Sequence, residues 1–191
     1  MTEPLTLVTI SGSLRAASYN TALLDNLPDL APPGLQFRRL EIRDLPVYNG
    51  DLEHDGLPPE IVRVLQRDIR SSDGLIIATP EYNHGVPGSL KNAIDWLSRG
   101  PAPHGHDGVP SAILGASDGT IGTTRAQSAL RQTLAALNSP AMPQPQVLVA
   151  TAQNKIDAEG RITAEGTRNY IAMWLVAVER WMRRFPRSER E

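Results

Sequence analysis

The sequence contains no cysteine among its 191 residues. This absence excludes disulfide bonds, thiolate-ligated zinc or iron–sulfur sites, and a thiol nucleophile. Any redox chemistry would therefore have to come from a bound cofactor. Charge of one sign is not in large excess either. The 19 Lys and Arg residues nearly balance the 21 Asp and Glu residues and leave a formal charge of -2. That balance provides no general field for binding nucleic acid or an anionic membrane.

Long apolar runs are also absent. The longest uninterrupted one, residues 170–178, is too short to cross a bilayer. The first residues, Met-Thr-Glu-Pro, lack the basic segment of a secretory signal, so we expect a cytoplasmic protein. A length of 191 residues with 40% hydrophobic residues predicts one folded domain over residues 1–191.

Short apolar strands alternate with amphipathic helices along the whole chain. The expected strands cover residues 5–10, 35–42, 74–79, 111–115 and 147–150. The expected helices begin near residue 18 and then cover residues 58–71, 87–98, 123–137 and 163–184. This alternation predicts an α/β fold, with a doubly wound five-stranded parallel sheet between two layers of helices. Such sheets bind ligands beyond the carboxyl ends of their strands, which directs attention to the loops 11–20, 80–88 and 117–122.

The loop after the first strand is rich in small hydroxyl side chains and holds one arginine. Ser13, Ser18 and Asn20 are side-chain donors, and Arg15 offers a guanidinium fork, a combination that suits a phosphate dianion. The simpler interpretation is that Ser18 only caps a helix. No Walker A and no G-x-G-x-x-G motif occurs in the chain, so ATP hydrolysis and a dinucleotide fingerprint lose their main support.

The loop after the third strand combines two prolines and two glycines with an aromatic ring. A rigid backbone beside Tyr82 can present a surface to a flat ligand, although an ordinary turn explains the composition as well. His84 is either a general acid or a surface histidine. On the following helix, Lys91 and Asp95 have the i,i+4 spacing of a surface ion pair.

Residues 115–119 match G-x-S-x-G, the motif of a hydrolase nucleophile elbow. That fold needs an acid and a histidine after the serine, but every histidine of this chain precedes Ser117. A conventional triad cannot be built. The remaining interpretation is a Gly/Ser loop whose backbone donors face a polar ring edge, with Gly119 allowing close approach.

Three further segments have plain interpretations. Residues 104–107, His-Gly-His-Asp, contain metal-ligand side chains, but a solvated loop is the better explanation and we expect no metal site. The apolar stripe that holds Trp174 and Trp181 is explained by core packing or by a subunit interface. The mixed charge run after Trp181 is expected to be a frayed, solvated end.

Taken together, the segments 12–20, 80–83 and 87–96 resemble the NADPH-dependent FMN reductase family, which includes bacterial quinone and chromate reductases. Segments 45–49 and 125–132 resemble the same family in the right order. The resemblance implies a flavodoxin-like fold, bound FMN, NADPH or NADH as electron donor, and a homodimer or homotetramer with flavin sites near the subunit interface. It also implies reduction of quinones, azo compounds, metal oxyanions such as chromate, or free flavin by a ping-pong mechanism.

Within that resemblance, the cofactor site falls on the three loops already singled out. The implied FMN-binding residues are Ser13, Leu14, Arg15, Ser18, Tyr19, Asn20, Pro80, Glu81, Tyr82, Asn83, His84, Gly85, Ser117 and Gly119. No side chain is needed as a catalytic acid or base, because N5 of the flavin carries the chemistry. The alternative is a flavodoxin-like carrier reduced by a protein partner, although a formal charge of -2 does not suggest the acidic docking face of such carriers.

Overall fold

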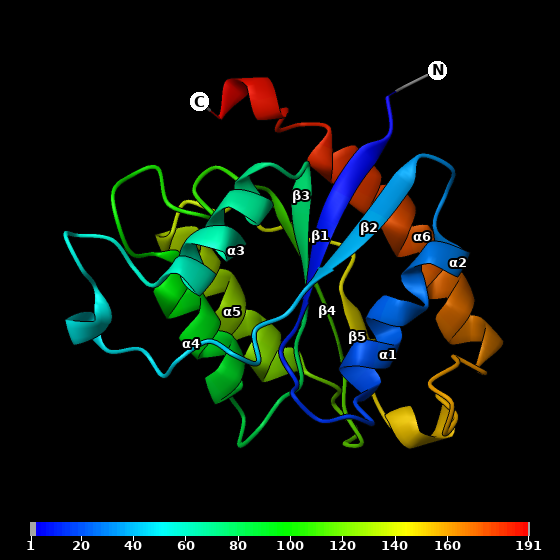
Figure 1. The fold of residues 1–191 in the computed structure, drawn as a ribbon. Coiled ribbons are helices and arrows are strands. Elements are labelled where there is room, and N and C mark those ends of the chain that lie inside the picture. Colours follow the sequence, from blue (N-terminus) through cyan, green and yellow to red (C-terminus); the bar gives the residue numbers. More distant parts are fainter. Residues whose placement is uncertain (1–2, 191) are drawn as a thin grey trace.

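Five parallel strands form one sheet in the order β2-β1-β3-β4-β5 in the computed structural model, which describes residues 3–190 (Figure 1). The strands are β1 (Leu5–Ser11), β2 (Leu35–Leu40), β3 (Gly74–Ala78), β4 (Ser111–Ala116) and β5 (Val147–Val149). The chain moves outward from β1 to β2 and then returns across β1 to β3. This reversal creates a switch point between β1 and β3, which is where doubly wound sheets bind ligands.

Helices cover both faces of the sheet (Figure 1). One face carries α1 (Tyr19–Asp25), α2 (Leu27–Leu30) and α6 (Glu165–Met182), and the other carries α3 (Glu60–Arg70), α4 (Gly88–Leu97) and α5 (Thr124–Ala136). Successive strand residues alternate between the two cores. In β3, for example, Ile76 packs in one core and the neighbouring Leu75 and Ile77 pack in the other.

The apolar spacing of the sequence explains why these helices form. In α3 the buried residues Val62, Leu65 and Ile69 recur at intervals of three and four, and the helix begins directly after Pro59. The expected α/β architecture and all five strands are confirmed. The boundaries differ by one or two residues at most ends, and the short helix α2 and the 3-10 turns at Gly50–Leu52, Ala152–Asn154 and Arg187–Glu189 were not predicted.

The apolar stripe of the last helix lies inside the molecule. Trp174, Leu175, Val178 and Met182 are buried in the core between α6 and the sheet. Core packing is therefore the correct interpretation of these four residues, and Trp181 packs partly buried against the same core.

The end after Trp181 is largely exposed, as expected, but the prediction that it is frayed was wrong because two arginines anchor it. Arg190 donates hydrogen bonds to the carbonyl oxygens of Ser72 (3.0 Å) and Asp73 (2.8 Å), and Arg187 donates to Ser71 (2.6 Å). The sequence analysis missed this because the acceptors are main-chain carbonyls at the start of β3, more than 100 positions away. Met1, Thr2 and Glu191, which belong to the terminal segments treated above, lie outside the described residues. Among residues 3–190, no helix is long and apolar enough to cross a membrane.

Candidate functional site

The loops after β1, β3 and β4 meet around one cavity of about 310 Å³ at the carboxyl edge of the sheet. Its lining contains nine of the residues expected at the cofactor site, together with Ala116 and Asp118. The nine are Ser13, Arg15, Ser18, Tyr19, Asn20, Pro80, Glu81, Tyr82 and Ser117. Leu14, Asn83, His84, Gly85 and Gly119 occupy neighbouring positions of the same loops. The parallel topology brings these segments together, because β1, β3 and β4 are adjacent and end at the same edge.

The first loop is held by its own hydroxyl groups. Ser18 accepts a hydrogen bond from the backbone N–H of Thr21 (3.3 Å), so the simple interpretation of Ser18 as a helix cap applies. The hydroxyl groups of Ser11 and Thr21 are 2.8 Å apart. The Arg15 side chain is exposed, and among residues 3–190 its guanidinium has no hydrogen-bond or ion-pair partner. Its donors are therefore available to an anion at this edge of the cavity.

Asn20 has a different environment from the one expected. Its side-chain N–H donates to the carbonyl oxygen of Ala116 (3.0 Å), and its side-chain oxygen accepts from the Ala116 N–H (2.9 Å). Asn20 is buried, so this pair of bonds fixes the start of α1 against the end of β4. Asn20 lines the cavity and bridges two of its loops, and its role as a phosphate donor stays a prediction.

The loop after β3 makes a tight turn that exposes its central residues. Tyr82 and Gly85 exchange backbone hydrogen bonds, and Asn83 and His84 between them have φ values of 48° and 64°. Positive φ at both central residues is the geometry of a type I′ turn, which asparagine tolerates well. The Tyr82 ring is 47% exposed, and its hydroxyl lies 3.4 Å from that of Ser13. A ring-sized surface therefore stands directly beside the first loop.

Glu81 lines the cavity, and its carboxylate is bonded to the start of α5. It accepts hydrogen bonds from the backbone N–H groups of Arg125 (2.9 Å) and Ala126 (3.0 Å) at the start of α5, and only 7% of the side chain is exposed. His84 lies 3.6 Å from Glu81 and also contacts the Arg125 guanidinium. The carboxylate of Glu81 therefore caps α5 and holds the turn in place, and contact of Glu81 with the flavin ring stays a prediction.

Backbone hydrogen bonds to β5 and to the residues that follow it hold the loop after β4 in place. Ser117 donates its N–H to Val149 (3.0 Å), and Thr151 donates its N–H to Gly119 (3.0 Å). The Ser117 hydroxyl accepts from the Gly119 N–H at 3.1 Å. A Cβ at Gly119 would have only the Ser117 hydroxyl near it, at 3.5 Å, so this backbone can approach a ligand closely.

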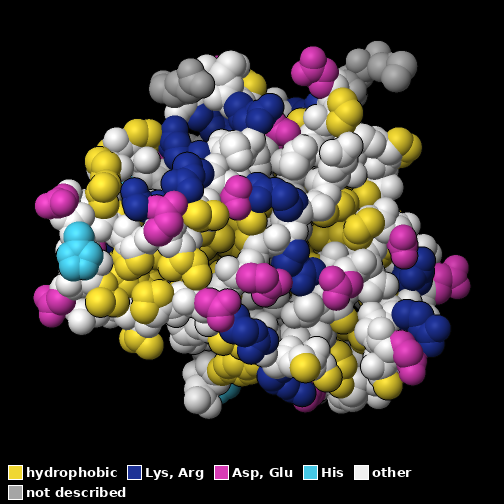
Figure 2. All heavy atoms as spheres, in the orientation of Figure 1, with side chains coloured by type: hydrophobic (Ala, Val, Ile, Leu, Met, Phe, Trp, Pro, Cys, Tyr) yellow, Lys and Arg dark blue, Asp and Glu magenta, His cyan; other side chains and the backbone are white. Residues whose placement is uncertain are grey.

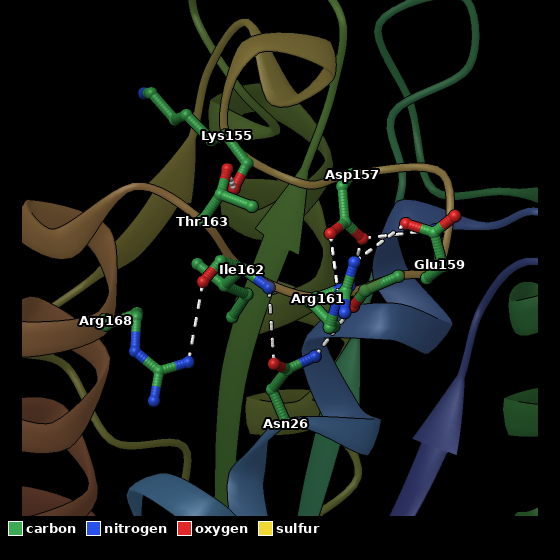
Figure 3. A network of polar contacts seen from close by, with 9 residues as sticks. Asn26, Lys155, Asp157, Glu159, Arg161, Ile162, Thr163 and Arg168 are labelled. Carbon is green, nitrogen blue, oxygen red and sulfur yellow. Dashed lines mark hydrogen bonds and ion pairs between the residues drawn. The ribbon is translucent and has the colours of Figure 1, made fainter.

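A second cavity of about 500 Å³ adjoins the first and shares Arg15, Ser18 and Tyr19 with it. Its far wall is a hairpin over residues 155–163 that the sequence analysis did not predict. Figure 3 shows Asn26 reaching this hairpin, where it donates to the Gly160 carbonyl (2.8 Å) and accepts from the Ile162 N–H (3.3 Å). The turn-forming residues Asp157 and Gly160 are the sequence feature from which this hairpin could have been predicted.

The chemistry of the site suits a flavin mononucleotide. The hydroxyl groups and free guanidinium of the first loop match a phosphate, Tyr82 and Pro80 offer flat apolar surface, and the Ser117–Gly119 loop offers polar backbone. A family model described as NADPH-dependent FMN reductase matches residues 5–154. The chain belongs to the NADPH-dependent FMN reductase family. This oxidoreductase therefore uses FMN as cofactor and NAD(P)H as electron donor, as expected.

Relatives of this reductase match it along almost its whole length. An NAD(P)H-dependent FMN reductase of Pseudomonas aeruginosa is 45% identical over 184 residues, which cover 96% of this chain and 98% of the relative. A quinone reductase of Escherichia coli is 40% identical over 186 residues, with the same two coverages. The solved structure of FerB, a flavoenzyme NAD(P)H:(acceptor) oxidoreductase from Paracoccus denitrificans, superposes with a TM-score of 0.86 at 36% identity, covering 95% of this chain and 99% of FerB. The flavodoxin-like fold is thereby confirmed.

The two other chemistries considered from the sequence find no support in the site. The Ser117 hydroxyl accepts a hydrogen bond from the Gly119 N–H, and within residues 3–190 it has no hydrogen bond to a histidine. His106 is buried, and within residues 3–190 neither of its ring nitrogens has a hydrogen-bond partner. In the same part of the chain, no three His, Asp or Glu side chains are arranged to hold a metal ion.

Proposed function

We propose that this protein oxidises NAD(P)H and reduces small quinones at the cavity formed by the loops after β1, β3 and β4. The observation that carries the proposal is the convergence of a free guanidinium, an exposed tyrosine ring and a glycine-containing loop on one cavity at the switch point. The names of the Pseudomonas and Escherichia relatives support the same activity. FMN supplies the redox chemistry when it is bound, through N5 of its ring.

The residues of this chain would bind and orient the cofactor. Ser13 and Arg15 would hold the phosphate, and Ser18 would support them by fixing the start of α1. Tyr82 with Pro80, and Ser117 with Gly119, would contact the ring from its apolar face and its polar edge. The remaining expected ligands, Leu14, Tyr19, Asn83, His84 and Gly85, would complete the rim, while Asn20 and Glu81 would position the loops.

The experiment measures the visible absorption spectrum of the purified protein and then its oxidation of NAD(P)H. We expect the purified protein to bind FMN and show flavin absorbance, and NAD(P)H alone to bleach it rapidly. Addition of a benzoquinone should then restore the absorbance and sustain NAD(P)H oxidation. Reduction only through a protein reductase would contradict the proposal in favour of an electron carrier, and a colourless protein after incubation with FMN would contradict both.

The range of acceptors and the kinetic order are further parts of this proposal. The exposed rim around Tyr82 discriminates mainly by access, so we propose that azo compounds, chromate and free flavin are reduced as well. Because NAD(P)H and the acceptor would use the same open face, we propose ping-pong kinetics. Initial-rate plots against NAD(P)H at several quinone concentrations should give parallel lines, whereas intersecting lines would mean that both substrates bind together.

We also propose a homo-oligomer, in which an apolar surface beside the site is covered by a second copy. The exposed apolar side chains gather on the loop after β2 and on the outer side of α3: Val47, Tyr48, Leu52, Leu57, Ile61 and Val64. Val47 is 84% exposed. Clusters of this kind on a small protein mark interaction surfaces.

A further inference from the structure

Four arginines converge on a hollow that is separate from the cofactor cavity. Arg67 and Arg70 come from the last turns of α3, and Arg187 and Arg190 come from the C-terminal segment. The hollow has a volume of about 430 Å³, and Asp107 is the one carboxylate in its lining. Figure 2 shows Lys and Arg side chains gathered between the C-terminal turn and α3. We call this hollow the arginine pocket.

The pocket lies near the amino-terminal end of β3, whereas the FMN site lies at the carboxyl ends of the strands. Its arginines bond to the residues that precede β3, whereas the FMN site is formed by residues that follow β1, β3 and β4. A ligand of the arginine pocket therefore cannot be the flavin or a substrate that contacts it. The whole chain carries a formal charge of -2, so this concentration of positive charge is local.

Two of the four arginines have carboxylate partners. Arg187 pairs with Asp73 at 3.1 Å, and Arg67 pairs with Glu60 at 3.0 Å. Glu60 is shared with Arg63, so its single charge is divided between two guanidinium groups. The carboxylates therefore only partly neutralise the positive charge of Arg67 and Arg187.

The other two arginines have no ion-pair partner among residues 3–190. Arg70 donates one hydrogen bond, to the carbonyl oxygen of His104 (3.3 Å), and a guanidinium has five N–H donors. Arg190 bonds only to main-chain carbonyls. The lining carboxylate Asp107 accepts a hydrogen bond from Asn138 (2.5 Å). Arg190 therefore contributes mainly uncompensated positive charge, and Arg70 contributes both charge and unused donors.

The environment of Arg190 shows that this charge is costly. Burial lowers the pKa of its guanidinium; Asp73 acts in the opposite direction, and Arg187 and Arg70 lower the pKa further. Like charges are thus held together at a half-buried place where water screens them poorly. The bonds from Arg187 and Arg190 to Ser71, Ser72 and Asp73 prevent these two side chains from moving apart.

We propose that the arginine pocket binds the oligophosphate group of a small-molecule ligand, with inorganic pyrophosphate as the simplest member of that class. Guanidinium groups bond phosphate oxygens in pairs, and arginines approaching from two segments match an anion with several charges spread over adjacent phosphates. A monovalent anion would leave most of the positive charge unbalanced. An anionic membrane suits a flat basic face, whereas these arginines line a hollow that also contains a carboxylate.

The test titrates pyrophosphate into the FMN-loaded protein at low ionic strength, with the heat of binding as the readout. FMN fills the phosphate loop after β1, and flavin absorbance confirms that it stays bound. We expect one saturable site whose affinity falls with added salt. Arg70→Gln should weaken binding about ten- to a hundredfold, because a charge-assisted contact is lost. Arg180→Gln, which removes an exposed arginine of α6, should leave the affinity unchanged.

Several results would overturn the proposal. One is the absence of a saturable heat of binding when pyrophosphate is titrated into the wild-type protein. Another is a pyrophosphate affinity equal to that of the wild type in both Arg70→Gln and Arg67→Gln. Equal affinity for orthophosphate would reject an oligophosphate site, and displacement of FMN by pyrophosphate would assign the binding to the phosphate loop. Co-sedimentation with anionic lipid vesicles, without pyrophosphate binding, would replace a small ligand with a membrane surface. Quinone reduction should be unchanged in Arg70→Gln, so a failure here is distinguishable from failure of the proposed function.

Discussion

At the scale of single residues, Arg15 differs from the other polar groups of the cofactor site because its side chain is not engaged within the described residues. Ser18, Asn20 and Glu81 all bond to backbone groups, so their substitution would disturb the loops as well as any ligand contact. Arg15 therefore allows a clean test of phosphate binding.

We expect Arg15→Ala to weaken FMN binding about ten- to a hundredfold, because a charge-assisted hydrogen bond contributes roughly 1.5 to 3 kcal/mol. Titration of the apoprotein with FMN, followed by flavin fluorescence, measures the affinity. The maximal rate should recover at saturating FMN, and Arg180→Ala is the matched control. A rate that stays low when the site is full would give Arg15 a role in the reaction itself.

His106 provides a pH-dependent prediction at the same scale. Burial lowers the pKa of its imidazole, and nearby His104 lowers it further. In the unfolded chain the pKa returns to about 6.5, so the unfolded state binds more protons as the pH falls below that value. The free energy of unfolding should therefore be highest above about pH 6.5 and decrease on acidification, until the lower pKa of the folded state is reached.

Urea unfolding at several pH values between about 5 and 8 tests this expectation. His106→Leu should flatten the pH dependence, because the leucine side chain has no proton to bind. His54→Gln, which changes an exposed histidine, should retain the wild-type slope. An unchanged slope in His106→Leu would assign the acid sensitivity to other groups.

At the scale of elements, the hairpin 155–163 is docked by the buried side chains of Ile156 and Ile162 and by polar contacts from Asn26, which lies between α1 and α2. Asn26 bonds to the hairpin at Gly160 and Ile162 and also donates to the Ala22 carbonyl (2.8 Å). Inside the hairpin, Asp157 accepts from the Arg161 N–H (2.8 Å), so the turn itself is locally stabilised (Figure 3). Asn26 supplies the polar part of the docking of the hairpin to α1.

Asn26→Ala should lower the free energy of unfolding by about 1 to 3 kcal/mol, since partly buried polar groups lose their partners. Amide hydrogen exchange over residues 155–163 should become faster, while exchange in the central strand β3 should change less. Asn154→Ala, at an exposed position of the neighbouring 3-10 turn, is the control. Wild-type protection of the hairpin in Asn26→Ala would show that its docking has another cause.

At the scale of the whole molecule, the exposed apolar surface on the loop after β2 and on α3 would be in contact with water in a monomer. Tyr48 on this surface packs edge-on against Trp96, with ring centroids 4.8 Å apart, and lies under the Arg99 guanidinium. The loop that carries Tyr48 is therefore anchored to α4, which makes it a firm surface for a second copy.

Light scattering should give a mass of at least twice the 20.8 kDa of one chain. Val47→Asp should shift the protein toward the monomer, because a carboxylate would be buried without a partner in the interface. Val176→Asp, on the outer face of α6, should retain the dimer. A monomer at all concentrations of the wild type would remove the proposed interface.

The local sequence determined the elements and the three loops of the site. The apolar spacing of β3 and α3 fixes a buried strand and a one-sided helix, and the alternation of such elements leaves a parallel sheet as the simplest arrangement. In such a sheet the loops after β1, β3 and β4 must meet, so the site could be located before its geometry was known.

Only the tertiary structure decided what the polar side chains bond to. Asn20 and Ala116 are 96 positions apart, Glu81 and Arg125 are 44 apart, and Arg190 and Ser72 are 118 apart. The acceptors or donors in these contacts are main-chain groups, which every residue carries and which no sequence pattern distinguishes. Their pairing depends on which strand and helix ends come together, and the folded sheet alone fixes that.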